Sequence, residues 1–205
     1  INLDGGSSTV FGVPSSELSR PKHTVLKERI GVVFDTVSMP GHLHVADVGR
    51  IFAHAFRTWN ARRFEQLTRE FGLAADKQVK ELSRGMGMKL SLACALSHEA
   101  QVLILDEATA ALGPMARDEL LDLLLDLVAD GERGILFSTH ITSDLDKCAT
   151  DIVHIRGGRV EAACPLAEYR ARFRLVGAEE ARRAGARVLG TRRTASGETA
   201  LVPSA

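Results

Sequence analysis

The stretch between residues 82 and 107 constrains the fold of this chain more than any other. An uninterrupted apolar run, Val102–Leu105, ends there in two adjacent carboxylates, Asp106 and Glu107. Four consecutive branched apolar residues are typical of a strand that is buried on both faces of a parallel sheet. In open α/β sheets, ligands bind beyond the carboxyl ends of such strands. We therefore expect an α/β protein with Asp106 and Glu107 at a ligand site.

Two further apolar runs have the same form and also end in polar residues. Ile30–Phe34 is followed by Asp35, and Ile135–Phe137 is followed by the polar run Ser138–His140. Segments with helical spacing separate the three runs, and this alternation is typical of a parallel α/β sheet. Because the carboxyl ends of parallel strands meet at one edge of the sheet, we expect these polar groups to gather near the two carboxylates.

The segment Val45–Phe71 has the spacing of amphipathic helices. Apolar residues recur in it at steps of three and four, including the aromatic stripe Phe52, Phe56 and Trp59. We interpret this stripe as core rather than as part of a ligand site, and the segment as a helical insertion beside the sheet. Another helix is predicted to start at Pro114, since proline is favoured in the first turn of a helix.

The C-terminal part of the chain differs in composition from the rest. Ile152–Ile155 and Arg159–Ala162 flank two glycines, which predicts a hairpin. From residue 165 onward there are eight arginines against four glutamates, with helical patterning near Leu166–Ala184 and a second hairpin signal around Gly197. We expect residues 165–205 to form a small accessory element whose basic side chains are a solvated surface rather than a lipid or nucleic-acid contact.

Composition narrows the class of protein further. With 205 residues, of which 45% are hydrophobic, the chain can bury the core of one domain with a small appendage. Twenty-six basic residues balance 26 acidic ones, so charge gives no reason to expect nucleic acid as a partner. The three cysteines have no C-x-x-C spacing, which argues against a disulfide framework or a zinc site and favours a reducing setting. No apolar run approaches the roughly 20 residues that span a bilayer, so any membrane role is expected to be peripheral.

Together these motifs resemble the ATP-binding subunit of an ABC transporter, over most of residues 1–164. Leu82–Met86 resembles the signature motif of that family, and Val102–Glu107 resembles its Walker B strand. Ala111–Gly113 resembles the D-loop, His140 the switch histidine, and Asp35 falls where the Q-loop glutamine usually lies. The letters S-R-G-M, followed shortly by M-K-L, are similar to bacterial exporter-type subunits.

The resemblance implies a P-loop NTPase-like fold, with a mostly parallel sheet and a helical subdomain at about residues 43–98. The ABC ATPase domain would cover residues 1–164 and the accessory element residues 165–205. No G-x-x-x-x-G-K-[ST] sequence occurs, and Ile1–Gly12 resembles the segment that follows the phosphate-loop helix. We therefore expect an N-terminally truncated domain, without a strand, loop and helix of about 30 residues. Without that loop, ATP phosphates would lose their principal cradle.

The resemblance also implies roles for the residues at the sheet edge. Asp106 would hold Mg²⁺ through a water, and Glu107 would accept a proton from the attacking water. The alternative for this acidic pair is a solvated cap of the next turn. His140 would contact the γ-phosphate and align the water with Glu107, or else be structural. Asp35 would reach Mg²⁺ through a water or simply end a strand.

Further roles are implied for the signature and the D-loop. The signature would receive the γ-phosphate of an ATP held by a second subunit, through Leu82, Ser83, Arg84 and Gly85. For Ser83 the alternative is an ordinary helix N-cap. Arg84 replaces the first signature glycine, Ala108 replaces the proline usual after Glu107, and Gly113 replaces the D-loop aspartate. The change at Gly113 removes a contact across the dimer, whereas Ala108 is expected to be benign.

The implied function is an ATPase subunit, with ATP and Mg²⁺ as cofactors, that drives transport through a separate transmembrane permease. Its partners would be a second ATP-binding subunit, identical or not, and the permease, which would hold it on the cytoplasmic face of the cell membrane. The alternative is a non-catalytic, truncated ABC-type partner or binding module, since the chain alone is expected to be weakly active or inactive. A third hypothesis, a soluble ABC protein acting on ribosomes or DNA, is disfavoured by the zero net charge and the single copy of each motif.

Overall fold

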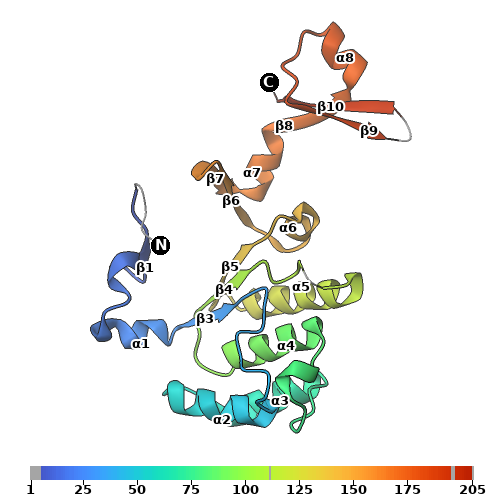
Figure 1. The fold of residues 1–205 in the computed structure, drawn as a ribbon. Coiled ribbons are helices and arrows are strands. Elements are labelled where there is room, and N and C mark those ends of the chain that lie inside the picture. Colours follow the sequence, from blue (N-terminus) through green and yellow to red (C-terminus); the bar gives the residue numbers. More distant parts are fainter. Residues whose placement is uncertain (1–5, 111, 195–196, 205) are drawn as a thin grey trace. The chain divides into compact units, whose positions relative to one another are not determined.

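The computed structural model describes residues 6–110, 112–194 and 197–204. The chain divides into two compact units, Ile1–Cys148 and Ala149–Ala205, and each is described by itself (Figure 1). The expected domain boundary at residue 164 stays a prediction.

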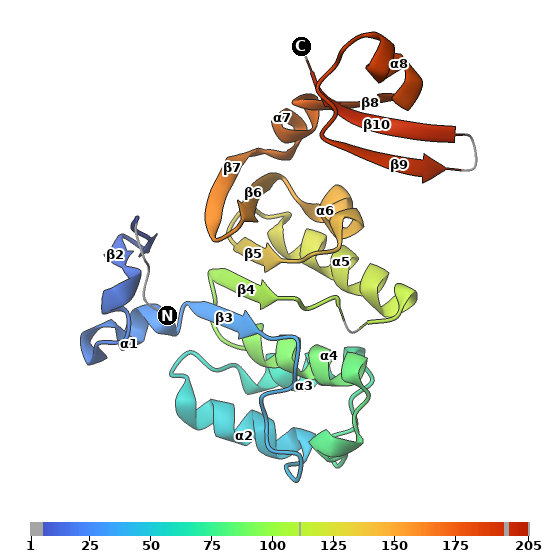
Figure 2. The same cartoon turned by 45° about the horizontal axis from the view of Figure 1, so that its top comes forward.

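A three-stranded parallel sheet is the centre of the first unit. Its strands are β3 (Ile30–Val33), β4 (Val102–Asp106) and β5 (Gly134–Ser138), in the order β3-β4-β5 (Figure 2). The predicted α/β class and all three predicted strands are confirmed. The register pairs Asp106 with Ser138, so the last residues of β4 and β5 lie side by side.

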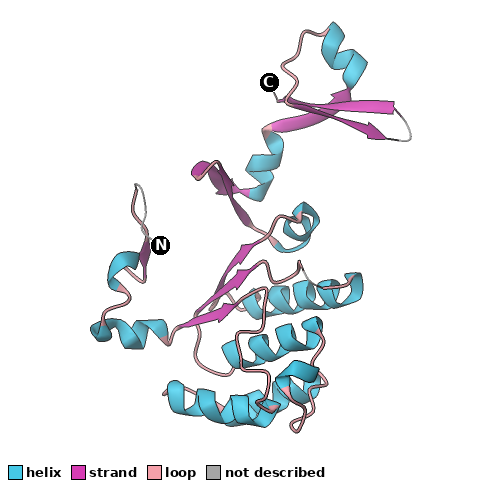
Figure 3. Ribbon diagram, viewed as in Figure 1, coloured by secondary structure: helices cyan, strands magenta, loops and turns pink. Residues whose placement is uncertain are grey.

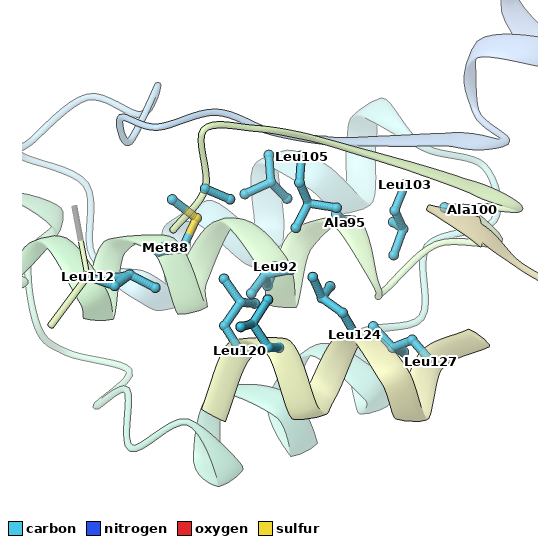
Figure 4. Close-up of a cluster of buried hydrophobic side chains, with 13 residues drawn as sticks. Met88, Leu92, Ala95, Ala100, Leu103, Leu105, Leu112, Leu120, Leu124 and Leu127 are labelled. Atoms are coloured by element: carbon cyan, nitrogen blue, oxygen red, sulfur yellow. The ribbon is translucent and has the colours of Figure 1, made fainter. Parts of the chain in front are cut away.

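Two helices cover one face of this sheet. They are α4 (Arg84–Ala95) and α5 (Pro114–Val128), the latter starting at the predicted proline (Figure 4). Gly31 of β3 allows the close approach of β4 and α4, because a Cβ atom there would lie 2.6 Å from Leu103 Cδ2 and 3.0 Å from Ala95 Cβ. The core of this layer is made of buried side chains from the sheet, α4 and α5, among them Val33, Leu92, Leu103, Leu105, Leu121 and Leu124.

The opposite face of the sheet is open to solvent over much of its area. Val32 and Leu136, on the edge strands, are 42% and 59% exposed. Leu105 and Phe137, the residues before Asp106 and Ser138, belong to the helix-covered core. Because successive side chains of a strand point to opposite faces, Asp106 and Ser138 lie on the open face. The polar strand ends are therefore accessible to a ligand.

A helical part packs on α4. It contains α2 (Val45–Ala55), α3 (Ala61–Glu70) and the 3₁₀ helix η3 (Val79–Glu81). The predicted insertion is thus two helices, separated by residues 56–60. Phe52 and Trp59 pack against its core and their rings are 5.6 Å apart, which agrees with the interpretation of the aromatic stripe as core.

Short elements complete the first unit. Before the sheet these are β1 (Thr9–Val10), β2 (Val13–Pro14), η1 (Ser15–Glu17), η2 (Pro21–His23) and α1 (Thr24–Lys27), and α6 (Thr142–Cys148) follows β5. Across the described residues of both units, no helix is long and apolar enough to cross a membrane.

The second unit is rich in antiparallel strands (Figure 3). It begins with the predicted hairpin, β6 (Asp151–Arg156) and β7 (Arg159–Pro165), followed by α7 (Leu166–Ala171). A three-stranded sheet of order β8-β10-β9 then packs on a short helix, α8. Its elements are β8 (Phe173–Gly177), α8 (Ala178–Arg183), β9 (Gly190–Thr194) and β10 (Gly197–Pro203).

Helical patterning near Leu166–Ala184 predicted helical structure there. This prediction is wrong for the middle of the segment. Residues Phe173–Gly177 form β8, which pairs with β10 along its whole length. The backbone groups of β8 find partners in a strand about 25 residues further along the chain, and this long-range pairing overrides the local helical pattern. The second hairpin is confirmed, because Gly197 of β10 pairs with Thr194 of β9.

Candidate functional site

The site is built where β4 and β5 end. The Ser138 hydroxyl donates a hydrogen bond to Oδ1 of Asp106, with an O···O distance of 2.6 Å. This length is typical of a hydroxyl bound to an ionised carboxylate, which is among the stronger hydrogen bonds in proteins. Asp106 is therefore held by the neighbouring strand although it is exposed to solvent.

Glu107 leaves the strand with an unusual backbone conformation. Its φ is +52°, in the left-handed region that residues other than glycine seldom adopt. Its amide donates to both the carbonyl oxygen and the hydroxyl of Ser138, at 3.1 and 3.2 Å. The chain turns sharply here, and the turn directs the Glu107 side chain toward the segment that follows β5.

His140 meets Glu107 at this point. Nδ1 of His140 lies 2.7 Å from Oε2 of Glu107, and their side chains are 71% and 35% exposed. The structure thus brings together the two residues that we predicted to act on the attacking water. A carboxylate paired with an exposed imidazole can accept a proton and orient a water molecule.

A second bond between the same two segments is fully buried. The Thr109 hydroxyl donates to Oδ2 of Asp144 at 2.7 Å, and the two residues are 0% and 2% exposed. Thr109 lies in the turn after Glu107, whereas Asp144 lies in α6, just after His140. This bond therefore fixes the two segments that carry the Glu107–His140 pair.

Sequence reasoning did not assign roles to Ser138, Thr109 or Asp144. A signal for Ser138 was present, because a hydroxyl residue ends an apolar strand that neighbours the strand of Asp106. Thr109 and Asp144 have no comparable signal, since a buried polar pair 35 residues apart is visible only once the chain is folded.

The signature residues lie at the start of α4. Ser83 is the N-cap of this helix, and its hydroxyl accepts a hydrogen bond from the Met86 amide at 3.3 Å. Ser83 thus caps the helix, as both interpretations of this residue expect, and its contact with a γ-phosphate stays a prediction. Ser83 and Arg84 are exposed, and Leu82 packs against the core of the helical part. Gly85 lies beside Leu112, since a Cβ at Gly85 would be 3.5 Å from it.

Asp35 follows β3 and shares a small cavity with Arg84. The cavity has a volume of about 110 Å³ and joins the predicted Q-loop position to the signature. The close approach depends on Gly87, because a Cβ atom there would lie only 2.2 Å from Cγ2 of Val37. The structure therefore brings Asp35 near the signature of its own subunit.

The predicted D-loop lies between the Glu107 turn and α5. Gly113 is the N-cap of α5 and gives it no side-chain cap, while Leu112 is buried. Ala111 falls outside the described residues.

The oxygen-rich strand ends suit Mg²⁺ as the cation. Asp106, Glu107 and Ser138 present carboxylate and hydroxyl oxygens, the donors that Mg²⁺ prefers. In the described part of the chain, no group of three or more His, Cys, Asp or Glu residues is placed to hold a metal ion. Mg²⁺ usually keeps several waters and takes further ligands from substrate phosphates, so Asp106 and Ser138 would supply only part of its coordination.

A parallel sheet with helices on one face and carboxylates at the carboxyl ends of its strands is the α/β arrangement of P-loop NTPase-like proteins. A family model described as ABC transporter matches residues 4–110, about half of the chain. The chain belongs to the ABC transporter family, as one of its ATP-binding domains.

Similar proteins include subunits of importers and exporters. The chain is 29% identical over 175 residues to the phosphonates import ATP-binding protein PhnC 1 of a Ruegeria species, covering 78% of this chain and 67% of that protein. It is 34% identical over 166 residues to the Nod factor export ATP-binding protein I of Sinorhizobium fredii, covering 76% and 46% respectively. The chain thus spans about half the length of the Nod factor relative.

A solved structure supports the same assignment. The chain resembles a protein described as the ATP-binding subunit of an ABC transporter, with a TM-score of 0.70 and 27% sequence identity. The match covers 82% of this chain and 70% of that one. Since relatives include an importer and an exporter subunit, the exporter-like form stays a prediction.

Proposed function

We propose that this chain is an ATP-binding subunit that couples ATP hydrolysis to transport through a separate transmembrane permease. The observation that carries the proposal is the 2.7 Å contact between His140 and Glu107, beside Asp106 at the ends of two parallel strands. Phosphoryl transfer to water needs an oriented nucleophile and charge neutralisation, and this arrangement suits both needs.

In this proposal Glu107 accepts a proton from the attacking water. His140 holds the carboxylate through Nδ1, which leaves Nε2 as the ring nitrogen available to the γ-phosphate. Asp106 would hold Mg²⁺ through a water, and the bound ion would supply neutralisation of the phosphate charge. The bond of Asp106 to Ser138 supports this role because it keeps the carboxylate in place without a cation.

The signature would act on an ATP held by a second subunit. Ser83 and Arg84 are exposed at the start of a 12-residue helix, where free amides and the helix dipole favour an anion. The partner would be a second ATP-binding subunit, and the permease would hold both at the cytoplasmic face of the membrane.

The test of catalysis needs a phosphate-binding loop, and the 205 residues contain no G-x-x-x-x-G-K-[ST] sequence. We would therefore compare the chain with a chimera that carries a strand, phosphate loop and helix from an ABC subunit ahead of residue 6. The chimera should hydrolyse ATP at about 1 s⁻¹ or faster, the usual range of enzymes, whereas the chain alone should show no saturable turnover.

Substitution of the proposed base gives the decisive result. In the chimera, Glu107→Gln should abolish turnover and keep ATP binding, because it removes a proton acceptor but little volume. Glu99→Gln is the control, since Glu99 is an exposed glutamate that precedes β4 and lies away from the carboxyl ends of the strands. Normal hydrolysis by the Glu107→Gln chimera would remove Glu107 from its role.

A second candidate is a non-catalytic ABC-type partner, whose exposed signature residues Ser83 and Arg84 would serve a second subunit. Such a partner would use its signature but not Glu107. In a mixture of the chain with the Glu107→Gln chimera, ATP should then drive association, measurable by light scattering. Ser83→Arg in the chain should prevent this association, and Glu107→Gln in the chain should not.

A further inference from the structure

We infer that Ser138 is a positioning residue that sets the geometry of both Asp106 and Glu107. The inference rests on the proposed function, because it concerns the two carboxylates that the proposal uses. A hydroxyl has one donor and two acceptor positions, and Ser138 uses both kinds on these two consecutive residues.

The donor side of the hydroxyl selects one oxygen of Asp106. Ser138 Oγ lies 2.6 Å from Oδ1, and the register of β4 and β5 places the two side chains on the same face of the sheet. With Oδ1 engaged by Ser138, Oδ2 is the oxygen that would be left for a hydrated cation. A freely rotating aspartate would present either oxygen in many orientations.

The acceptor side holds the turn at Glu107. The Glu107 amide donates to the Ser138 hydroxyl at 3.2 Å and to the Ser138 carbonyl at 3.1 Å. A left-handed conformation at a residue other than glycine persists only where several surrounding contacts enforce it. This shared amide contact is one such constraint, and it sends the Glu107 side chain to within 2.7 Å of His140.

The neighbouring hydroxyl provides a matched comparison. Thr139 accepts a hydrogen bond from the Ile141 amide at 3.0 Å, so it shapes the loop after the strand. This contact involves neither carboxylate. Ser138 and Thr139 therefore differ in what they hold, although they are adjacent hydroxyl residues at the end of β5 and directly after it.

The test uses the full 205-residue chain without nucleotide, in the variants Ser138→Ala, Ser138→Thr and Thr139→Ala. NMR measures the exchange rate of the Glu107 amide and its three-bond HN–Hα coupling, which reports φ. Ser138→Ala should speed exchange of this amide about five- to tenfold, as expected for the loss of one hydrogen bond, and move the coupling toward extended values. Ser138→Thr should restore both, and Thr139→Ala should change neither.

The melting temperature separates positioning from a general contribution to stability. All three variants should melt close to the parent chain, because the side chain of residue 138 is exposed and that of residue 139 is only partly buried. The inference is overturned if Ser138→Ala leaves exchange and coupling unchanged, if threonine fails to restore them, or if they change only together with the melting temperature. Since the measurement needs no ATP, failure of the proposed function in the chimera assay is a separate outcome.

Discussion

The buried bond between Thr109 and Asp144 leads to the most specific prediction about stability. Thr109→Val keeps the shape of the side chain but removes the hydroxyl that donates to Oδ2 of Asp144 at 2.7 Å. Because Asp144 is only 2% exposed, water cannot replace the lost donor without opening the structure. The variant therefore leaves a buried carboxylate oxygen without this partner.

The size of the effect follows from the burial of both residues. Loss of a hydrogen bond to a buried charged group costs about 3 kcal/mol at the upper end of its usual range. Thr109→Ser keeps the hydroxyl and removes one buried methyl group, which costs about 1 kcal/mol. We therefore expect the valine variant to be less stable than the serine variant by about 2 kcal/mol, although it matches the parent in volume.

Trp59 provides the assay, because it is the only tryptophan of the chain and lies in the first unit. Its fluorescence during urea unfolding reports the unit that contains Thr109, separately from the second unit. In thermal unfolding of a unit of this size, each kcal/mol of lost stability lowers the melting temperature by about 2–4 °C. Equal losses of stability in Thr109→Val and Thr109→Ser, within about 0.5 kcal/mol, would refute the view that the hydroxyl matters beyond its packing.

Three other predictions concern the helical part and the sheet. The pKa of Asp47 is lowered from 3.8 to about 2, chiefly by the hydrogen bond from the His44 amide. The stabilisation that the Asp47 carboxylate gives to α2 is therefore complete above pH 4 and is lost as the pH falls toward 2. Asp47→Asn should remove this acid dependence, measured by amide exchange of α2 between those pH values. Gly87→Ala should destabilise the first unit by about 1–3 kcal/mol in urea unfolding, because its Cβ would lie 2.2 Å from a valine methyl. Leu103→Ala should cost about 2–5 kcal/mol in the same assay, whereas Leu136→Ala, at a site 59% exposed, should cost less than about 1; equal costs would contradict the assigned faces of the sheet.

Much of the first unit was predictable because its signals are local. Val102–Leu105 is an apolar run typical of a strand buried on both faces, and Pro114 marks the start of α5. Ser83 could be placed at a helix start from its neighbours alone. These features depend on residues within one or two turns, so the order of the amino acids determines them.

The site itself required the tertiary structure. The sequence placed Asp106, Glu107 and His140 after strands, but only the parallel pairing of β4 with β5 brings Ser138 onto Asp106 and His140 onto Glu107. The left-handed turn at Glu107 likewise has no local signal, since its amide bonds to a residue 31 positions away.

The second unit shows the same division between local and long-range signals. Two glycines predicted the hairpin of β6 and β7 correctly, because a tight turn depends on the conformational freedom of the residues within it. The helical pattern of Leu166–Ala184 failed at Phe173–Gly177, where β10 supplies backbone hydrogen-bond partners to β8. Local sequence thus determined turns, caps and buried runs. Tertiary structure decided which distant polar and backbone groups are paired, because each group must find a partner once it leaves water.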